Sequence, residues 1–185
     1  VADEATLDAA VIDPGADSNL ILDYIERCHF HVRAILLTHG HFDHCMGLEE
    51  VYDATGATVY MSHADLTTDI GNGMFGNEDF ELDPPDDTVF VRSLTFDVLE
   101  TPGHTPGGIT YRCEDCLFTG DTLFRMSCGR YDFPGSSSLD LGRSLEKLRD
   151  LPGDYEVYPG HMDCSTLETE RRFNPYLTAL KNRGQ

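Results

Sequence analysis

The sequence predicts an α/β protein in which short strands and amphipathic helices alternate around one core. Short apolar runs that end in turn residues have the length of strands, as at residues 34–37. Apolar residues at helical spacing, such as Leu141, Leu145 and Leu148, indicate helices between them. The 185 residues with 40% apolar content suit a single domain, residues 1–185, with a sizeable core.

The N-terminal part begins with a strand at residues 9–12, which ends in the turn Asp13-Pro14-Gly15. Asp13 is either a turn former or a carboxylate that orients a ligand histidine. Ser18 is the expected N-cap of a helix that runs to about residue 29. The apolar stripe of this helix comprises Leu20, Ile21, Tyr24, Ile25 and Cys28. His29 and His31 are then expected at the surface or in packing, and not as ligands.

The strand at residues 34–37 leads directly into Thr38-His39-Gly40-His41-Phe42-Asp43-His44, which holds three histidines and an aspartate. In extended backbone His39 and His41 point the same way, whereas Asp43 and His44 follow the strand end, where the chain can turn. Imidazole and carboxylate groups suit Zn²⁺, Fe or Mn, but one loop cannot close a coordination shell. The loop therefore predicts a metal centre with two neighbouring positions and with further ligands from elsewhere.

Between residue 46 and the C-terminus the pattern predicts further strands and helices. They are helix 46–54, strands 58–61, 89–91 and 96–99, a hairpin of 109–111 with 117–119, helix 139–150 capped by Ser138, and a last helix from about residue 167. His63 is expected as a polar residue at a strand end. Residues 69–87, with Met74, Phe75 and Phe80, form either a rim that packs on substrate or a loop pinned by its own apolar side chains.

Three more residues with ligand side chains follow apolar runs on glycine-rich turns: His104, Asp121 and His161. Each one alone is more simply a turn residue or a satisfied polar group. Together the four loops carry five of the eight histidines, which a purely structural role does not explain. We therefore predict that all four loops contribute to one metal centre.

Composition narrows the class of function. The formal net charge of −20 argues against binding of nucleic acid, and no apolar run approaches the roughly 20 residues of a membrane span. Six cysteines without a visible secretory segment are expected as reduced thiols of a soluble, cytoplasmic protein. Cys113-Glu114-Asp115-Cys116 is more simply a hairpin turn than a redox or zinc site, since no second pair exists. We expect a small-molecule substrate; the oligomeric state stays open.

The predicted ligands occur in an order that resembles the metallo-β-lactamase superfamily: His39, His41, Asp43, His44, His104, Asp121 and His161. The segments 120–124 (Gly-Asp-Thr-Leu-Phe) and 128–130 (Cys-Gly-Arg) resemble its glyoxalase II branch. The resemblance spans nearly the whole chain and implies the four-layer αββα sandwich of the metallo-β-lactamase fold. It assigns His39, His41 and His104 to one metal. Asp43, His44 and His161 are assigned to a second metal, with Asp121 bridging the two.

The resemblance implies two divalent metal ions, most simply zinc, with iron or manganese as alternatives. It further implies hydrolysis of a small thioester, such as a 2-hydroxyacyl glutathione, by attack of a metal-bridging hydroxide. Asp43 is the expected catalytic residue, because it would ligate a metal and orient the hydroxide. Arg130 is expected to bind a carboxylate of the thiol part of the substrate. A structural ion pair with Asp132 is the alternative for Arg130.

Other classes stay open beside the hydrolase. Persulfide dioxygenases carry a segment like residues 128–133 and would use a single Fe(II) held by His39, His104 and Asp121. A metal-containing binding protein without activity is disfavoured because no ligand position is missing, and a β-lactamase because its sites lack the context around Asp121. Members of the resembled family carry a strand before residues 9–12, and full-length glyoxalase II adds a C-terminal helical domain. Either the first strand is absent here or the numbering starts at an internal point of the protein. We expect the C-terminal helical domain to be missing, so that a preference for glutathione is open.

Overall fold

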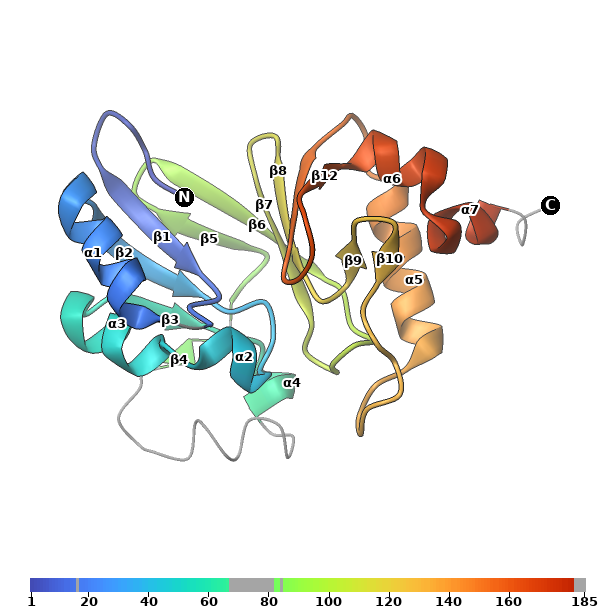
Figure 1. The fold of residues 1–185 in the computed structure, drawn as a ribbon, viewed down its shortest axis with the longest axis horizontal. Coiled ribbons are helices and arrows are strands. Elements are labelled where there is room, and N and C mark those ends of the chain that lie inside the picture. The colour runs from blue at the N-terminus through green and yellow to red at the C-terminus, as the bar shows by residue number, and fades with distance from the viewer. Residues whose placement is uncertain (16, 67–81, 84, 182–185) are drawn as a thin grey trace. The chain divides into compact units, whose positions relative to one another are not determined.

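The chain folds into two compact units, Val1–Val98 and Leu99–Gln185. A computed structural model describes all residues except 16, 67–81, 84 and 182–185 (Figure 1). Most of the irregular segment 69–87, including Met74, Phe75 and Phe80, lies outside the described residues.

The first unit is built on a four-stranded parallel sheet in the order β1-β2-β3-β4 (Figure 1). Its strands are β1 (Asp8–Ile12), β2 (His31–Leu36), β3 (Thr58–Tyr60) and β4 (Leu82–Asp83). Its helices are α1 (Ser18–Cys28), α2 (Phe42–Cys45), α3 (Leu48–Thr55) and α4 (His63–Leu66). An antiparallel hairpin of β5 (Thr88–Val91) and β6 (Leu94–Glu100) follows. Because parallel strands share a direction, the turns after β1, β2 and β3 lie at the same edge of the sheet.

Helices α1 and α3 pack side by side over this sheet (Figure 1). The core that they cover comprises Val32, Ile35, Leu37, Cys45, Leu48, Val51, Ala57, Val59 and Met61. The predicted stripe of α1 is partly wrong, because Leu20 and Tyr24 are exposed, and Leu22 packs on the core with Ile21 and Ile25. The N-cap is Asp17, and not Ser18, since the Asp17 side chain accepts a hydrogen bond from the Leu20 backbone N–H.

The predicted helix 46–54 is also shifted. Asp43 and His44 lie inside the separate short helix α2, and α3 begins only at Leu48. The break falls at Gly47, whose N–H donates to the carbonyl of Pro14 at 2.8 Å. A Cβ at Gly47 would lie 3.2 Å from that carbonyl oxygen, so the small residue permits the close approach of the two loops.

The second unit has a mixed sheet in the order β12-β11-β8-β7, in which β8 and β11 are parallel (Figure 1). Its strands are β7 (Ile109–Cys113), β8 (Cys116–Gly120), β11 (Glu156–Pro159) and β12 (Ser165–Thr166). A two-stranded hairpin comprises β9 (Leu123–Phe124) and β10 (Ser127–Cys128). The helices are α5 (Ser138–Arg149), α6 (Leu167–Phe173) and α7 (Pro175–Lys181).

The helical stripe of α5 is confirmed, since Leu141, Leu145 and Leu148 are buried in the core of the second unit. The N-cap is Ser137 and not Ser138, because the Ser137 hydroxyl accepts from the Asp140 backbone N–H. The predicted last helix is two helices, because Pro175 lacks an N–H and keeps Asn174 in an extended conformation with ψ 119°.

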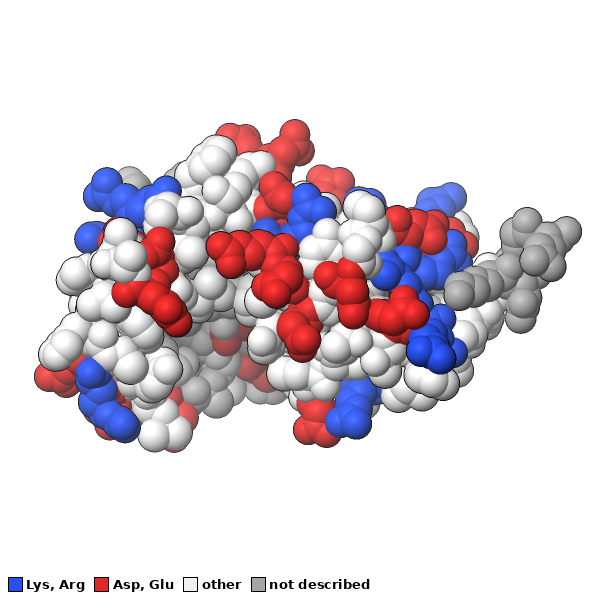
Figure 2. Space-filling view, turned by 90° about the horizontal axis from the view of Figure 1, so that it is seen from above, with Lys and Arg blue, Asp and Glu red and all other residues white. Residues whose placement is uncertain are grey.

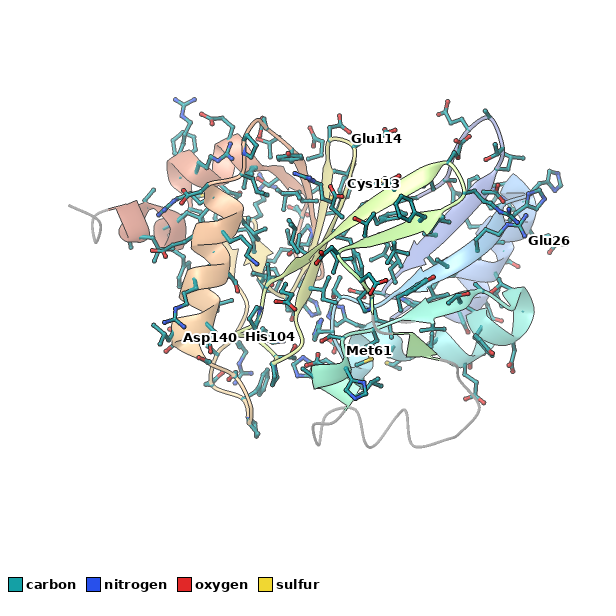
Figure 3. All side chains as sticks on the ribbon, turned by 180° about the vertical axis from the view of Figure 1, so that it is seen from behind. Glu26, Met61, His104, Cys113, Glu114 and Asp140 are labelled. Atoms are coloured by element: carbon teal, nitrogen blue, oxygen red, sulfur yellow. The ribbon has the colours of Figure 1, made fainter. Side chains whose placement is uncertain are left out.

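The Cys113–Cys116 segment is a hairpin turn, as predicted. Cys113 pairs with Cys116 across the turn between β7 and β8. Glu114, in the turn, has φ 52°. Figure 3 shows Cys113 and Glu114 at the end of these strands opposite to His104. No disulfide joins any of the six cysteines, all of which lie in the described part of the chain.

The surface reflects the charge of the sequence. Figure 2 shows many acidic side chains on the face that it draws, with basic side chains among them. The predicted surface positions of His29 and His31 are confirmed, since both are exposed.

Among the described residues, no helix is both long enough and apolar enough to cross a membrane.

Candidate metal centre

Strand β2 delivers the first histidine loop, as the sequence predicts. Its last residues and Leu37 are buried, which fixes the strand end from which the loop starts. The rings of His39 and His41 converge, with His39 Nε2 3.0 Å from His41 Nδ1. Two ligand nitrogens of a tetrahedral zinc ion lie about 3.3 Å apart, given bond lengths of about 2.0–2.1 Å. The pair is therefore spaced to hold a common ion.

His44 is oriented by Asp13. His44 is buried, and its Nδ1 lies 2.9 Å from Asp13 Oδ2. A carboxylate accepts, so Nδ1 carries the proton and Nε2 keeps the lone pair that a metal needs. The sequence left two roles open for Asp13. The structure shows that its carboxylate holds the ring of His44, a predicted ligand, and its φ of 47° shows that it also forms the turn after β1.

The same carboxylate acts on His39 through Thr38. Thr38 donates its backbone N–H to Asp13 Oδ1 at 2.7 Å and its hydroxyl to Asp13 Oδ2 at 2.6 Å. The Thr38 hydroxyl lies 3.1 Å from His39 Nδ1. Since that hydroxyl has given its only proton to Asp13, it accepts from His39 Nδ1–H, and Nε2 is again the metal-binding nitrogen.

Asp65 is a residue beside the predicted site that the sequence did not single out. It lies in α4 and is fully buried, and its Oδ2 accepts the Gly40 backbone N–H at 3.0 Å. Gly40 separates His39 from His41, so Asp65 fixes the turn on which both rings stand. No local pattern marks this residue, because the contact joins positions 25 residues apart. His63, expected only at a strand end, opens the same helix.

Asp43 is the most exposed of the predicted ligands in the first unit, with a side-chain exposure of 39%. Its Oδ2 lies 3.9 Å from His44 Nε2, on the side of the ring opposite to Asp13. The carboxylate and the imidazole thus offer one oxygen and one nitrogen toward the same side. That arrangement can contribute two ligands to a second metal position.

In the second unit the three predicted ligands come together. His104, Asp121 and His161 follow β6, β8 and β11, in agreement with the predicted strand ends. Asp121 Oδ2 lies 3.3 Å from His104 Nε2 and 3.6 Å from His161 Nε2. His104 and Asp121 are buried, whereas the His161 side chain is 49% exposed. One carboxylate oxygen therefore stands between two imidazole nitrogens from separate loops.

The segment around Arg130 orients His104. The Arg130 carbonyl oxygen lies 2.8 Å from His104 Nδ1, so that Nδ1 carries the proton and Nε2 faces Asp121. Gly129 packs against the backbone of Asp121, where a Cβ would lie only 1.8 Å from the carbonyl oxygen. Only glycine allows this approach, which keeps the segment against both ligands.

The Arg130 side chain forms the ion pair that the sequence offered as its alternative role. Its Nε and Nη2 each donate to Asp132 at 2.9 Å, and the guanidinium lies 4.2 Å from the centre of the Phe133 ring. The hydrogen bond with Asp132 raises the pKa of Arg130 and lowers the pKa of Asp132. Phe133 in turn meets His104 edge to face at 5.9 Å. Arg130 is thus held beside a predicted ligand.

These side chains fit divalent metal ions. Three imidazoles have Nδ1 held by an acceptor, which leaves Nε2 of His39, His44 and His104 as the donor atoms. Neutral imidazole and carboxylate suit zinc, iron or manganese, so the donor set does not select among them. The thiol closest in sequence, Cys45, is a poor ligand, because burial raises its pKa and disfavours the thiolate.

A family model and several similar proteins indicate the same family for this chain. A family model described as the metallo-beta-lactamase superfamily matches residues 5–161. An uncharacterized protein of Mycobacterium tuberculosis is 34% identical over 97% of this chain and 92% of that protein. A probable metallo-hydrolase of Streptococcus pyogenes is 34% identical over 90% of this chain and 80% of its own length. A hydroxyacylglutathione hydrolase of Shewanella baltica is 37% identical over 93% of this chain and 64% of that protein.

Solved structures share the fold. BLEG-1, described as a B3 metallo-beta-lactamase, matches with a TM-score of 0.84 and 31% identity, over 96% of this chain and 92% of that one. ETHE1 from Myxococcus xanthus gives 0.80 and 29% identity, over 100% and 84%. TTHA1623 in a di-iron-bound form gives 0.78 and 35% identity, over 90% and 88%.

The predicted fold class is therefore confirmed as the α/β metallo-β-lactamase fold, the αββα sandwich that the resemblance implies. The family model spans most of the sequence, and relatives above 30% identity cover nearly all of it. The chain belongs to the metallo-β-lactamase superfamily.

Proposed function

We propose that the protein is a metal-dependent hydrolase that cleaves small thioesters of the 2-hydroxyacyl-glutathione type. Its family and its likeness to a protein named hydroxyacylglutathione hydrolase support this proposal. The observation that carries it is the position of Asp121 Oδ2 between His104 Nε2 and His161 Nε2, at 3.3 and 3.6 Å. A carboxylate in this place is suited to serve two metal positions at once.

The proposed ligand assignment follows the family pattern. His39, His41 and His104 hold the first metal. Asp43, His44 and His161 hold the second, and Asp121 serves both. Zinc is our first choice, although iron and manganese accept the same donors, and a protein similar to this chain is described in a di-iron-bound form.

Two bound ions would supply Lewis-acid polarisation of the thioester carbonyl and would lower the pKa of the attacking water. Asp43 is our proposed catalytic residue. Its partly exposed carboxylate can accept a hydrogen bond from this water and turn the water's lone pair toward the carbonyl carbon. A thiolate is a good leaving group, so the reaction needs no side chain to protonate the sulfur as the C–S bond breaks.

Arg130 is the proposed contact for a carboxylate of the thiol part of the substrate. Asp132 engages Nε and Nη2, so the substrate carboxylate would bind at the Nη1 side of the guanidinium. The net charge of −20 supports a small substrate and no nucleic acid. The absence of disulfides among the six cysteines supports a cytoplasmic location as part of the same proposal.

A persulfide dioxygenase with one Fe(II) held by His39, His104 and Asp121 is the second candidate. The specific observation in its favour is the segment Cys128-Gly129-Arg130-Tyr131-Asp132-Phe133, which resembles those enzymes. Its geometry, with Arg130 locked by Asp132 over Phe133, suits an anionic thiol derivative as well as a thioester.

Metal content and oxygen dependence separate the two candidates. The purified chain is analysed for metals per chain, and cleavage of lactoylglutathione is followed in air and under nitrogen. The hydrolase should hold about two ions and release one thiol per acid at equal rates in both atmospheres. A single iron, rapid uptake of O₂ with glutathione persulfide and release of sulfite, with negligible thioester cleavage, would refute the hydrolase. A β-lactam is assayed as a third compound, because BLEG-1, which is similar to this chain, is described as a β-lactamase.

A further inference from the structure

Two buried polar residues in α6 and at its end, Glu170 and Asn174, form hydrogen bonds with the β9–β10 hairpin. Both are fully buried. Glu170 lies in α6, and Asn174 is the residue at which α6 ends. Neither residue belongs to the predicted ligand set. Fully buried polar side chains need their hydrogen bonds satisfied, so the identity of their partners shows what they hold.

Asn174 holds the hairpin backbone on both strands. Its Nδ2 donates to the carbonyl of Phe124 in β9 at 3.2 Å and to the carbonyl of Ser127 in β10 at 2.9 Å. A third contact, at 2.8 Å, joins Nδ2 to Glu170 Oε2. The amide therefore ties the two strands to the end of α6.

Glu170 holds the turn of the same hairpin. Its Oε2 accepts the backbone N–H of Met126 at 2.7 Å, and its Oε1 accepts the Ser165 hydroxyl at 2.6 Å. Met126 has φ 58°, a conformation that a non-glycine residue adopts only at some cost. The carboxylate thus stabilises a strained turn whose shape determines where Phe124 lies.

Phe124 connects the hairpin to His161, a predicted ligand, because the two rings are in contact. Its side chain is 7% exposed, and its ring meets the ring of His161 edge to face, with centroids 5.9 Å apart at 86°. The His161 backbone is placed separately, since the N–H of Gly160 donates to Gly120 at 2.9 Å. The ring plane of this half-exposed imidazole is therefore restrained by a side chain that the C-terminal helices hold.

We infer that Glu170 and Asn174 are positioning residues that hold His161, through Phe124, in the orientation that the second metal requires. The inference rests on the proposed function, which assigns His161 to that metal. We call Glu170 and Asn174 together the corner between α6 and α7. It follows that this corner determines whether the site holds one ion or two. His104 is held by the Arg130 carbonyl and not by Phe124, so we expect a change at Glu170 or Asn174 to affect the first position less than the second.

The test is a titration of the metal-free protein with Zn²⁺, with metals per chain counted after dialysis against a weak chelator. The unmodified protein should retain about two ions. Asn174→Ala should keep one ion and bind the second about 10–100-fold more weakly, the usual effect of losing a group that orients a ligand. Phe124→Leu keeps an apolar side chain and removes the aromatic edge, and it should lose the same ion. It carries the test if Asn174→Ala does not fold.

Arg171→Ala is the matched control, because Arg171 lies in the same helix and its guanidinium hydrogen-bonds to the end of α5 and the segment after it, and not to the hairpin. Its guanidinium donates to the carbonyls of Arg149 at 2.7 Å and Gly153 at 2.6 Å, and also to that of Leu151. This variant should lower the Tm of the metal-free protein and still retain two ions. A merely structural role of α6 predicts instead that Arg171→Ala also loses the second ion.

The outcomes separate the inference from the proposed function. Two ions of unchanged affinity in both Phe124→Leu and Asn174→Ala would overturn the inference alone, as would loss of the second ion in Arg171→Ala. Two ions in the unmodified protein without thioester cleavage would overturn the proposed function, while the counts in the variants still decide the inference. One ion in the unmodified protein would overturn both.

Discussion

Replacing Asp13 tests the proposed centre most directly, because its carboxylate orients the rings of two predicted ligands, His39 and His44. It receives three hydrogen bonds, from the N–H and the hydroxyl of Thr38 and from His44 Nδ1, at 2.7, 2.6 and 2.9 Å. Through the hydroxyl it also fixes His39. The proposed assignment puts His39 and His44 on different metals. We therefore expect a change at Asp13 to weaken both positions.

Asp13→Asn replaces one oxygen by an NH₂ group and leaves the size unchanged. If the NH₂ faces the Thr38 N–H, two donors meet at the 2.7 Å contact. If it faces His44, then His44 Nδ1 must accept, and the proton moves to Nε2, the nitrogen that the metal needs. Either orientation should lower metal affinity about 10–100-fold at both positions, which is about 1.4–2.8 kcal/mol each.

The assay is zinc titration against a competing chelator, with ¹⁵N spectra of the imidazoles in the metal-free protein to record the tautomers. Thr38→Val should weaken only the position of His39, since the contact from Asp13 to His44 does not pass through Thr38. Asp8→Asn is the control, because Asp8 is a mostly buried aspartate of β1 that pairs with Arg33. Unchanged affinities and tautomers in Asp13→Asn would refute the reasoning.

Three further predictions concern packing, a thiol and charge. Gly129→Ala should cost metal affinity and activity about tenfold or more, because its Cβ would lie 1.8 Å from the Asp121 carbonyl oxygen. Gly142→Ala in α5, where a Cβ meets nothing within 4 Å, should keep both and raise stability by up to about 1 kcal/mol; equal losses in the two variants would contradict this explanation. Burial raises the pKa of Cys116 from 9.0 to about 11, so alkylation by iodoacetamide should be slow at pH 8 and rise until about pH 11. The same shift contributes stability below pH 9.0 that is lost as the pH rises toward 11, a loss that Cys116→Ser should remove and that would be absent if the thiol were solvated. Because the net charge is −20, Tm should rise between about 0.1 and 1 M NaCl as the screening length falls from about 10 to 3 Å, and a falling Tm would contradict dominant self-repulsion (Figure 2).

The ligand loops could be predicted from the sequence because their signals are local. Each ligand loop follows an apolar run by a few residues, and a strand end is where an α/β fold exposes side chains. His39 and His41 illustrate this, since their two-residue spacing predicts converging rings and the structure gives nitrogens 3.0 Å apart. The hairpin at Cys113–Cys116 was predictable for the same reason, as two apolar runs flank a two-residue turn.

The contacts of Asp65 and Asn174 could not be predicted, because their partners lie far away in sequence, whereas Asp13 was among the expected orienting groups. Asp65 contacts Gly40 across 25 residues, and Asn174 contacts the carbonyl of Phe124 across 50. The strands β9 and β10 have two residues each, which is too short for any alternation to show. The exposed Leu20 and Tyr24 share a helical stripe with partly buried neighbours, and only the packing of α1 separates them.

The orienting groups also explain how the chain can prepare a metal centre before a metal arrives. His39 and His44 take their tautomers from Asp13 and Thr38, and His104 takes its tautomer from the Arg130 carbonyl. Each of these partners lies in the same unit as the ligand that it orients. A metal therefore meets rings whose orientation these contacts already set, and the free energy of binding is not spent on orienting them.

His161 differs from the buried predicted ligands in its exposure and in its aromatic contact. The contact that Phe124 makes is with the ring, which restrains the plane of the imidazole but does not select a tautomer. Its exposure of 49% adds to the difference, because solvent competes for a half-exposed imidazole more than for a buried one. Among the proposed ligands, the position that His161 serves should thus be the more easily emptied, which is why the corner between α6 and α7 can control it.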